Sequence, residues 1–101
     1  MKRVLLVGAG GWARQKWVDV ILRDFADRVR VAGVVDIDEN KLRDAADALG
    51  VPTEGRFTST ESAFAATDAD ICMISTPPAH HARAAVLAAE KGMHILSEKP
   101  I

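Results

Sequence analysis

The sequence predicts an α/β fold of the doubly wound type, a parallel sheet of about five strands with helices on both faces. Short apolar runs alternate along the chain with segments in which apolar residues recur at helical spacing, and this alternation is typical of βαβ units. The runs are rich in valine, leucine and isoleucine, as in strands buried on both faces. Right-handed crossovers leave few topologies for such a chain, and the strand order 3-2-1-4-5 is the simplest.

The strands are predicted at residues 3–8, 29–36, 56–60, 70–76 and 93–99. The first, RVLLVG, is an unbroken apolar run, whereas the third, RFTST, is only weakly marked. In the predicted order the first and fourth strands lie side by side. Gly8-Ala9-Gly10 and Ser75-Thr76-Pro77 follow them, and we expect these two loops to meet where such sheets bind ligands.

Helices are predicted between the strands, and the first two are long. One begins near Ala13, with an apolar stripe at Trp17, Val18, Ile21, Leu22 and Phe25. Asp38 is expected to cap the next helix, which ends at Gly50. Its inward face is predicted to consist of Leu42, Ala45, Ala46 and Leu49.

Two further helices follow in the second half of the chain. Thr58 and Glu61 have the spacing of a capping box, which predicts a brief helix near Phe64. The last helix is predicted from about Ala79 to Lys91, with Gly92 as its terminator. Its inward face is expected to consist of Ala82, Ala85, Val86 and Ala89.

Composition limits the class of protein. The chain has 101 residues, 49% of them hydrophobic and 27% charged, as in one globular domain with a modest core. The net charge of −1 argues against nucleic acid or an anionic membrane as a partner. The single cysteine, Cys72, excludes an internal disulfide and fits a reducing compartment. The apolar start resembles a secretory signal, but Gly8 breaks the run and no cleavage site follows, so we expect a cytoplasmic protein without a membrane span.

The loop after the first strand, Gly8-Ala9-Gly10-Gly11-Trp12-Ala13, has the form G-x-G-x-x-A. In this motif the first glycine permits a tight turn, and the second lets a pyrophosphate approach the backbone. The third small residue, here Ala13, lets the helix pack closely on the strand. The N-terminus of that helix offers free N–H groups to the phosphates. The loop therefore predicts a Rossmann-type dinucleotide site formed by Gly8, Gly10, Gly11, Trp12 and Ala13.

An acid at the end of the second strand supports this prediction. Asp36 follows Ala13 by 23 residues, and a carboxylate there can accept hydrogen bonds from both hydroxyls of an adenosine ribose. The alternative is that Asp36 is an ordinary turn residue. Because Ile37, Asp38 and Glu39 follow it and none is a cation, we expect NAD to be preferred over NADP.

Two other nucleotide sites are less consistent with the sequence. An S-adenosylmethionine-dependent methyltransferase usually has a further acid just before the glycines, where this chain has Leu6 and Val7. A P-loop would need Gly-Lys-Ser/Thr after the glycine loop, and none follows. His80 and His81 are adjacent, so on a helix they point about 100° apart, and we expect no metal site.

The motifs GAGGWA, Asp36, STPPAHH and SEKP, in this order and spacing, resemble the N-terminal half of the glucose–fructose oxidoreductase / inositol dehydrogenase / rhizopine catabolism family, usually called Gfo/Idh/MocA. The resemblance covers essentially the whole chain, and its most specific element is T-P-x-x-x-H followed by E-K-P. Ser97 stands where the family often has cysteine, and Pro78 where it often has asparagine.

The resemblance implies roles for the residues that match. Thr76, Pro77 and His81, together with Ser75, would belong to the family's cofactor-side loop. Glu98 would also lie at the cofactor, and Lys99 would be the catalytic lysine near the nicotinamide and substrate. The cofactor would be NAD, with NADP less favoured. Hydride would pass between it and a hydroxyl of a sugar or polyol.

The family continues with a second α/β domain that supplies the substrate pocket and most of the oligomer interface. We therefore expect residues 1–101 to be a dinucleotide-binding domain that lacks the substrate domain. A stand-alone nucleotide-binding or regulatory module and the cofactor half of a two-chain enzyme are the alternatives. An uncovered fifth strand would favour self-association into a dimer or larger species.

Overall fold

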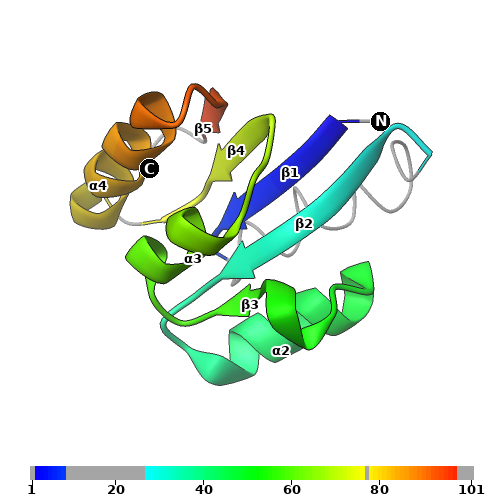
Figure 1. The fold of residues 1–101 in the computed structure, drawn as a ribbon. Helices are drawn as coiled ribbons and strands as arrows, with labels where there is room; N and C mark the ends of the chain where they lie inside the picture. The colour runs from blue at the N-terminus through cyan, green and yellow to red at the C-terminus, as the bar shows by residue number, and fades with distance from the viewer. Residues whose placement is uncertain (1, 9–26, 77, 98–101) are drawn as a thin grey trace.

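The computed structural model describes residues 2–8, 27–76 and 78–97, which form one parallel sheet with helices around it (Figure 1). The strands are β1 (Lys2–Val7), β2 (Val29–Val35), β3 (Arg56–Phe57), β4 (Ile71–Ile74) and β5 (His94–Ser97). The helices are α2 (Glu39–Leu49), the 3₁₀ turn η2 (Thr53–Gly55), α3 (Thr60–Ala66) and α4 (Pro78–Glu90). The predicted helix from Ala13 to Phe25 lies outside the described residues.

The strand order is β3-β2-β1-β4-β5, as the sequence predicts. All four neighbouring pairs are parallel. At the carboxyl end of the sheet Val7 is in register with Val35 on one side and with Ile74 on the other. Ile74 is in turn in register with Ser97. The segments that follow β1, β2, β4 and β5 therefore start from one edge of the sheet.

Helices cover both faces of the sheet, α2 on one and α3 and α4 on the other, which makes the fold doubly wound (Figure 1). On β1, Val4 and Leu6 point into a cluster that contains Leu42, Ala45 and Ala46 of α2. Leu5 and Val7 point to the opposite face and into a second cluster, because successive side chains of a strand alternate between its two faces. The four β1 residues from Val4 to Val7 are at most 1% exposed. Burial on both faces accounts for the unbroken apolar run in the sequence.

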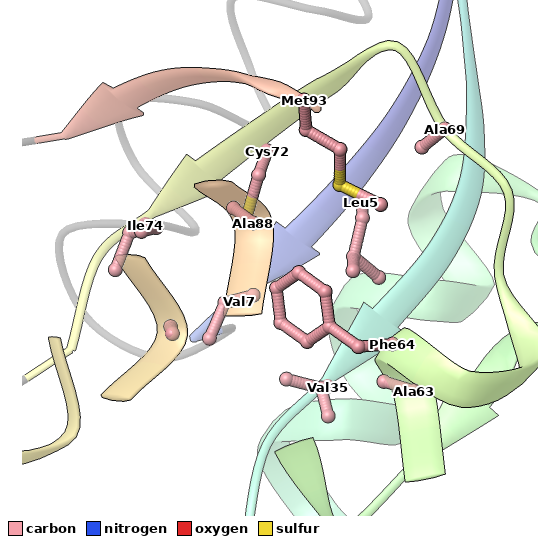
Figure 2. Packing of buried hydrophobic residues seen from close by; sticks show 11 residues of the cluster. Leu5, Val7, Val35, Ala63, Phe64, Ala69, Cys72, Ile74, Ala88 and Met93 are labelled. Carbon is pink, nitrogen blue, oxygen red and sulfur yellow. The ribbon is translucent and has the colours of Figure 1, made fainter. Parts of the chain in front are cut away.

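The second cluster lies between the sheet and the helices α3 and α4. Figure 2 shows the ring of Phe64, from α3, beside Leu5, Val7 and Val35 of the sheet. Ala84 and Ala88 of α4 are completely buried in the same cluster. Small residues at these two positions, four apart on one helical face, let the α4 backbone approach the sheet closely.

This packing corrects the predicted face of α4. Of the four predicted inward residues, Ala85 packs partly buried against the second cluster, but Val86 is 49% exposed and Ala82 and Ala89 are also exposed, and Ala84 and Ala88 face the sheet instead. The helix contains six alanines, so several of its faces are about equally apolar and the sequence periodicity does not distinguish them. The face is defined by the packing instead, because Ala84 and Ala88 are completely buried in the second cluster and Ala85 and Leu87 pack partly buried against it.

The predicted helix ends are confirmed for α2 and shifted for α3. The side chain of Asp38 accepts hydrogen bonds from the N–H groups of Asn40 and Lys41, and Gly50 ends α2 with a φ of 69°. The cap of α3 is Ser59, one residue after the predicted Thr58, and its hydroxyl accepts from the N–H of Ser62. Both positions carry a hydroxyl, so the neighbouring residue serves the same purpose. No helix in the described ranges is long and apolar enough to cross a membrane.

Candidate dinucleotide site

The first glycine of the predicted loop ends β1 in a tight turn. Gly8 has a φ of 95°, a conformation that residues with a Cβ rarely adopt. Its N–H donates to the carbonyl of Val35 at 2.8 Å, which ties the turn to the end of β2. The tight turn expected at Gly8 is therefore present in the structure.

The same glycine is pressed against the loop that follows β4. A Cβ on Gly8 would lie 2.3 Å from the carbonyl oxygen of Ser75 and 3.0 Å from Cγ2 of Thr76. The N–H of Ser75 donates to the carbonyl of Val7 at 2.8 Å, so the ladder between β1 and β4 continues up to this contact. The two loops that the topology was expected to bring together are thus in direct contact, and only glycine permits it.

Asp36 is held at the end of β2 by hydrogen bonds along the chain. Its N–H donates to the carbonyl of Phe57 at 3.1 Å. Its carboxylate oxygen Oδ1 accepts from the N–H of Asp38 at 2.8 Å, which is an Asx turn around Ile37. Asp36 is half-buried, whereas the side chain of Ile37 is 77% exposed. The carboxylate is therefore held by the Asx turn, in the residue that follows the Val35 carbonyl to which Gly8 donates.

The anchoring role of Phe57 could not be predicted from the sequence. Its carbonyl holds the backbone of Asp36 because β3 pairs with β2 through Val35 and Phe57. The β3 strand has only two residues, so its apolar pattern is too short to be recognised. The only available signal was the weak RFTST stretch.

Thr76 contributes an unusual polar atom. Its hydroxyl oxygen is buried and has no hydrogen-bond partner among the described residues, although most buried polar side-chain atoms in proteins have one. Ser75 and Thr76 are both half-buried. Within the part of the chain that the structure describes, this hydroxyl makes no hydrogen bond, and its residue lies against the Gly8 turn.

The two adjacent histidines of α4 differ in their exposure. His81 is half-buried and His80 is exposed, within the first turns of the helix. In the described ranges no group of three or more His, Cys, Asp or Glu side chains is placed to share a metal ion. The remaining predicted site residues, Gly10, Gly11, Trp12, Ala13, Pro77, Glu98 and Lys99, lie outside the described residues.

Cys72 is excluded as a nucleophile at neutral pH. The residue is completely buried in the second cluster, and this burial raises the pKa of its thiol to about 12. Because the thiolate is the reactive form, the thiol of the folded protein is unreactive at neutral pH. Cys72 is a core residue of β4.

The opposite edge of the sheet carries a shallow charged depression. It is lined by Lys2, Arg3, Asp27, Arg28 and Asp70. The Arg3 N–H donates to the carboxylate of Asp70 at 2.9 Å, and this bond lowers the pKa of Asp70. Ligands of open α/β sheets bind at the carboxyl ends of the strands, and this depression lies at the amino end of β1. We interpret the Arg3 and Asp70 side chains in this depression, whose Nε and Oδ2 atoms are 3.8 Å apart, as a structural ion pair.

The described residues fit a dinucleotide at the carboxyl edge. An acid ends β2, a glycine turn ends β1, and a buried unpaired hydroxyl follows β4. These features lie in the order in which an extended dinucleotide would meet them, since β1 lies between β2 and β4. Asp36 would hold the adenosine ribose, and the Gly8 turn would let the pyrophosphate approach.

Comparison with known proteins agrees with this geometry. A family model described as "Oxidoreductase family, NAD-binding Rossmann fold" (GFO_IDH_MocA) matches residues 2–101. The uncharacterised protein y4oX of Sinorhizobium fredii is 46% identical over 101 residues, which cover 98% of this chain and 28% of that protein. The D-xylose 1-dehydrogenase (NADP(+)) 2 of Haloferax volcanii is 34% identical over 76 residues, or 75% of this chain and 23% of that protein.

A solved structure gives the same result in three dimensions. The WlbA dehydrogenase of Chromobacterium violaceum, crystallised with NADH and UDP-GlcNAcA, superposes with a TM-score of 0.83 at 32% identity. The match covers 98% of this chain and 27% of that one. The chain therefore spans less than a third of the length of each of these relatives.

Proposed function

Because this chain belongs to the Gfo/Idh/MocA oxidoreductase family, of which it forms the NAD-binding Rossmann domain, we propose that it holds the nicotinamide cofactor of a sugar or polyol dehydrogenase. The observation that carries the proposal is the contact of Gly8 with Ser75. Gly8 ends β1, which lies in the sheet between β2, followed by Asp36, and β4, followed by Thr76. This contact brings the glycine turn and the loop after β4 together at the edge where such folds bind dinucleotides. The cofactor would supply the hydride acceptor for oxidation of the substrate carbon that bears a hydroxyl, and the proton of that hydroxyl would leave to a base.

The proposed cofactor is NAD rather than NADP. A 2′-phosphate would be placed against the Asp36 carboxylate, which the Asx turn with Asp38 fixes in position. Asp38 and Glu39 add two further carboxylates at the start of α2, so this segment carries like charges that disfavour a phosphate near it. The relative from Haloferax volcanii is named for NADP(+), and the preference proposed here rests on the acids of this chain.

The catalytic role is proposed for Lys99. It lies two residues after Ser97, whose partner in register is Ile74, just before Ser75 and Thr76. An ammonium group near the nicotinamide would orient the substrate and stabilise the charge that develops on its oxygen. Glu98 and His81 are proposed to assist on the cofactor side, with Gly10, Gly11, Trp12, Ala13 and Pro77 completing the binding loops.

The substrate side is proposed to come from residues beyond these 101. The chain spans 28% of the relative from Sinorhizobium fredii, and its described residues present a cofactor edge. The proposed substrate class is a sugar or polyol. WlbA was crystallised with a nucleotide sugar, which is consistent with that class.

Calorimetric titration tests the proposal directly. The 101-residue chain is titrated with NAD, NADP and ADP under the same conditions. NAD should bind with at least about tenfold higher affinity than NADP, because each charge-assisted hydrogen bond to the ribose contributes about 1.5–3 kcal/mol. ADP should bind as well, since it shares the adenosine and pyrophosphate. Equal affinity for NAD and NADP would contradict the role of Asp36, and no binding of any of the three would contradict the function.

A further inference from the structure

We infer that Arg56 is a positioning residue of the cofactor site, which strengthens the preference for NAD by holding the Asp36 carboxylate in place through β3. This inference rests on the proposed function and extends it to a side chain that is directed toward α2. It starts from two contacts of the Arg56 guanidinium, one with α2 and one with the segment that follows this helix.

Asp36 is held by hydrogen bonds from two elements. From β3, the carbonyl of Phe57 accepts the N–H of Asp36 at 3.1 Å. From the residue that caps α2, the N–H of Asp38 donates to Oδ1 of Asp36 at 2.8 Å. The place of the carboxylate therefore depends on where β3 and α2 lie relative to each other.

The guanidinium of Arg56 links these two elements. Its Nη1 lies 2.8 Å from Oδ1 of Asp47, which belongs to the last turn of α2. Its Nε donates to the carbonyl of Val51, two residues after the helix, at 2.9 Å. Both bonds are charge-assisted, and a planar guanidinium presents its N–H groups in fixed directions. Together they fix the start of β3 against the end of α2.

This link matters because β3 is very short. The strand consists of Arg56 and Phe57, which are in register with Val34 and Val35 of β2. Successive side chains of a strand alternate between its faces, and Phe57 packs against the second cluster on the face opposite α2. Arg56 is thus the side chain through which β3 is attached to α2. Its loss would leave the Phe57 carbonyl, and with it Asp36, less firmly placed.

The expected signature is a change in cofactor preference. Arg56→Met keeps an unbranched side chain and removes the guanidinium. A less firmly placed Asp36 carboxylate should bind the ribose hydroxyls more weakly and oppose a 2′-phosphate less. The ratio of NAD affinity to NADP affinity should therefore fall about three- to tenfold, the range for loss of one hydrogen bond. A smaller fraction of folded chain would weaken both cofactors equally and leave the ratio unchanged.

The experiment titrates NAD and NADP by calorimetry, well below the melting temperature, into the parent chain, Arg56→Met, Arg56→Lys and Asp47→Asn. Arg56→Lys keeps the charge and should recover part of the ratio. Asp47→Asn changes an exposed residue of α2, so it tests the ion pair even if Arg56→Met does not fold. It should lower the ratio by a smaller factor, because the bond to Val51 remains.

Arg43→Met is the matched control. Arg43 is an exposed arginine of α2 whose Nη2 donates to Oδ1 of Asn40, in the same helix, at 2.7 Å. Its removal takes away a guanidinium and a hydrogen bond without touching β3. The ratio of the two affinities should therefore equal that of the parent chain.

A double-mutant cycle with Asp36→Ala shows whether the effect of Arg56 passes through Asp36. In the Asp36→Ala chain the carboxylate that Arg56 positions is gone. Adding Arg56→Met there should change neither the NAD affinity nor the ratio of NAD to NADP affinity.

Three results would overturn the inference and leave the proposed function intact. An unchanged ratio in Arg56→Met and Asp47→Asn would show that the ion pair does not place the acid. Equal weakening of NAD and NADP would assign Arg56 to stability alone. A loss in the Asp36→Ala chain as large as in the parent would place the effect elsewhere than on Asp36. A parent chain that binds neither cofactor would instead overturn the proposed function, so the two failures are distinguishable.

Discussion

The carboxylate of Asp36 accepts a hydrogen bond from the N–H of Asp38 at 2.8 Å, and the carboxylate of Asp38 in turn caps α2 through the N–H groups of Asn40 and Lys41. The proposed ribose acceptor is therefore the first member of a hydrogen-bonded series that ends in a helix. Its position depends on the turn, whereas its affinity for a ribose depends on its charge. These two contributions can be separated by substitution.

Asp36→Asn and Asp36→Ala are the substitutions that separate them. Asn keeps an oxygen that can accept from Asp38, whereas Ala removes both the turn bond and the charge. We expect Asp36→Ala to weaken NAD binding by at least about tenfold, and Asp36→Asn to weaken it less, because neutral hydrogen bonds are about half as strong as charged ones. Both should narrow the preference for NAD over NADP.

Calorimetry with NAD and NADP on each variant checks this prediction. Glu90→Gln, an exposed acid at the end of α4, is the charge-matched control for Asp36→Asn. An unchanged ratio of the two affinities in Asp36→Asn would mean that the Asp36 charge does not select the cofactor.

Gly8→Ala should be much more destabilising than Gly50→Ala. Both glycines have positive φ, 95° and 69°, but a Cβ at Gly8 would meet the carbonyl oxygen of Ser75 at 2.3 Å, whereas a Cβ at Gly50 would meet nothing within 4 Å. Each substitution should cost about 1–2 kcal/mol for the left-handed backbone. Gly8→Ala should cost a further 1–3 kcal/mol, roughly, for overpacking against Ser75.

Urea denaturation of the two variants measures the difference in the free energy of unfolding. The difference combines the contact of the new Cβ with Ser75 and Thr76 and the extra backbone cost of a φ of 95° over one of 69°. Equal destabilisation would indicate that the loop after β4 moves away at little cost, and that the two loops are not tightly coupled.

The sequence predicted the sheet well because the apolar runs of its central strands are typical of strands buried on both faces. β1 is apolar at every position from Val4 to Val7, which only a strand buried on both faces requires. The strand order then followed from crossover rules. The predicted inward face of α4 was wrong at Ala82, Val86 and Ala89 and right at Ala85, because six alanines give the helix no single apolar face and the sequence does not distinguish Ala84 and Ala88 from the others.

For the candidate site, the sequence and the topology predicted which segments meet, but not the contacts between their atoms. The spacing of the glycine loop and Asp36 is a property of the sequence. The approach of Gly8 to Ser75 depends on the register of β1 with β4, and so does the position of the Thr76 hydroxyl, which has no hydrogen-bond partner among the described residues. Residues far apart in the chain meet there, and no local pattern encodes the meeting.

The edge strand β5 should make the 101-residue chain self-associate. Among the described strands β5 pairs only with β4, and its Ile95 and Leu96 are 38% and 44% exposed. An apolar edge strand readily pairs with a second copy. We expect a dimer or larger species in sedimentation at moderate concentration, and Leu96→Lys should shift it toward monomer, because a charge on an edge opposes pairing.

Val86→Lys is the control for that variant. Val86 is also an exposed apolar residue, at 49%, but it lies on α4. The Val86→Lys variant should associate like the parent chain if β5 forms the contact. A strictly monomeric parent chain up to millimolar concentration would refute the prediction.

Cys72 should make the protein lose stability at alkaline pH. Burial raises the pKa of its thiol from 9.0 to about 12, so above pH 9 the unfolded chain releases this proton and the folded chain does not. The free energy of unfolding then falls as pH rises from about 9 toward 12, because the folded state binds more protons. Below pH 9 both states hold the proton and the thiol contributes no slope.

Denaturation of the parent and Cys72→Ala at several pH values isolates this term. The other ionisable groups are the same in both proteins, so their contribution cancels in the difference. Cys72→Ala should be less stable at pH 7 because it leaves a small cavity in the core. Between pH 8 and 10 the parent should lose about 1.4 kcal/mol relative to the variant, the value for one group at one pH unit above its unfolded pKa. Parallel curves across this range would mean that the thiol ionises in the folded protein. Rapid reaction of the native protein with a thiol reagent at pH 8 would then be the expected companion result, since the thiolate is the reacting form.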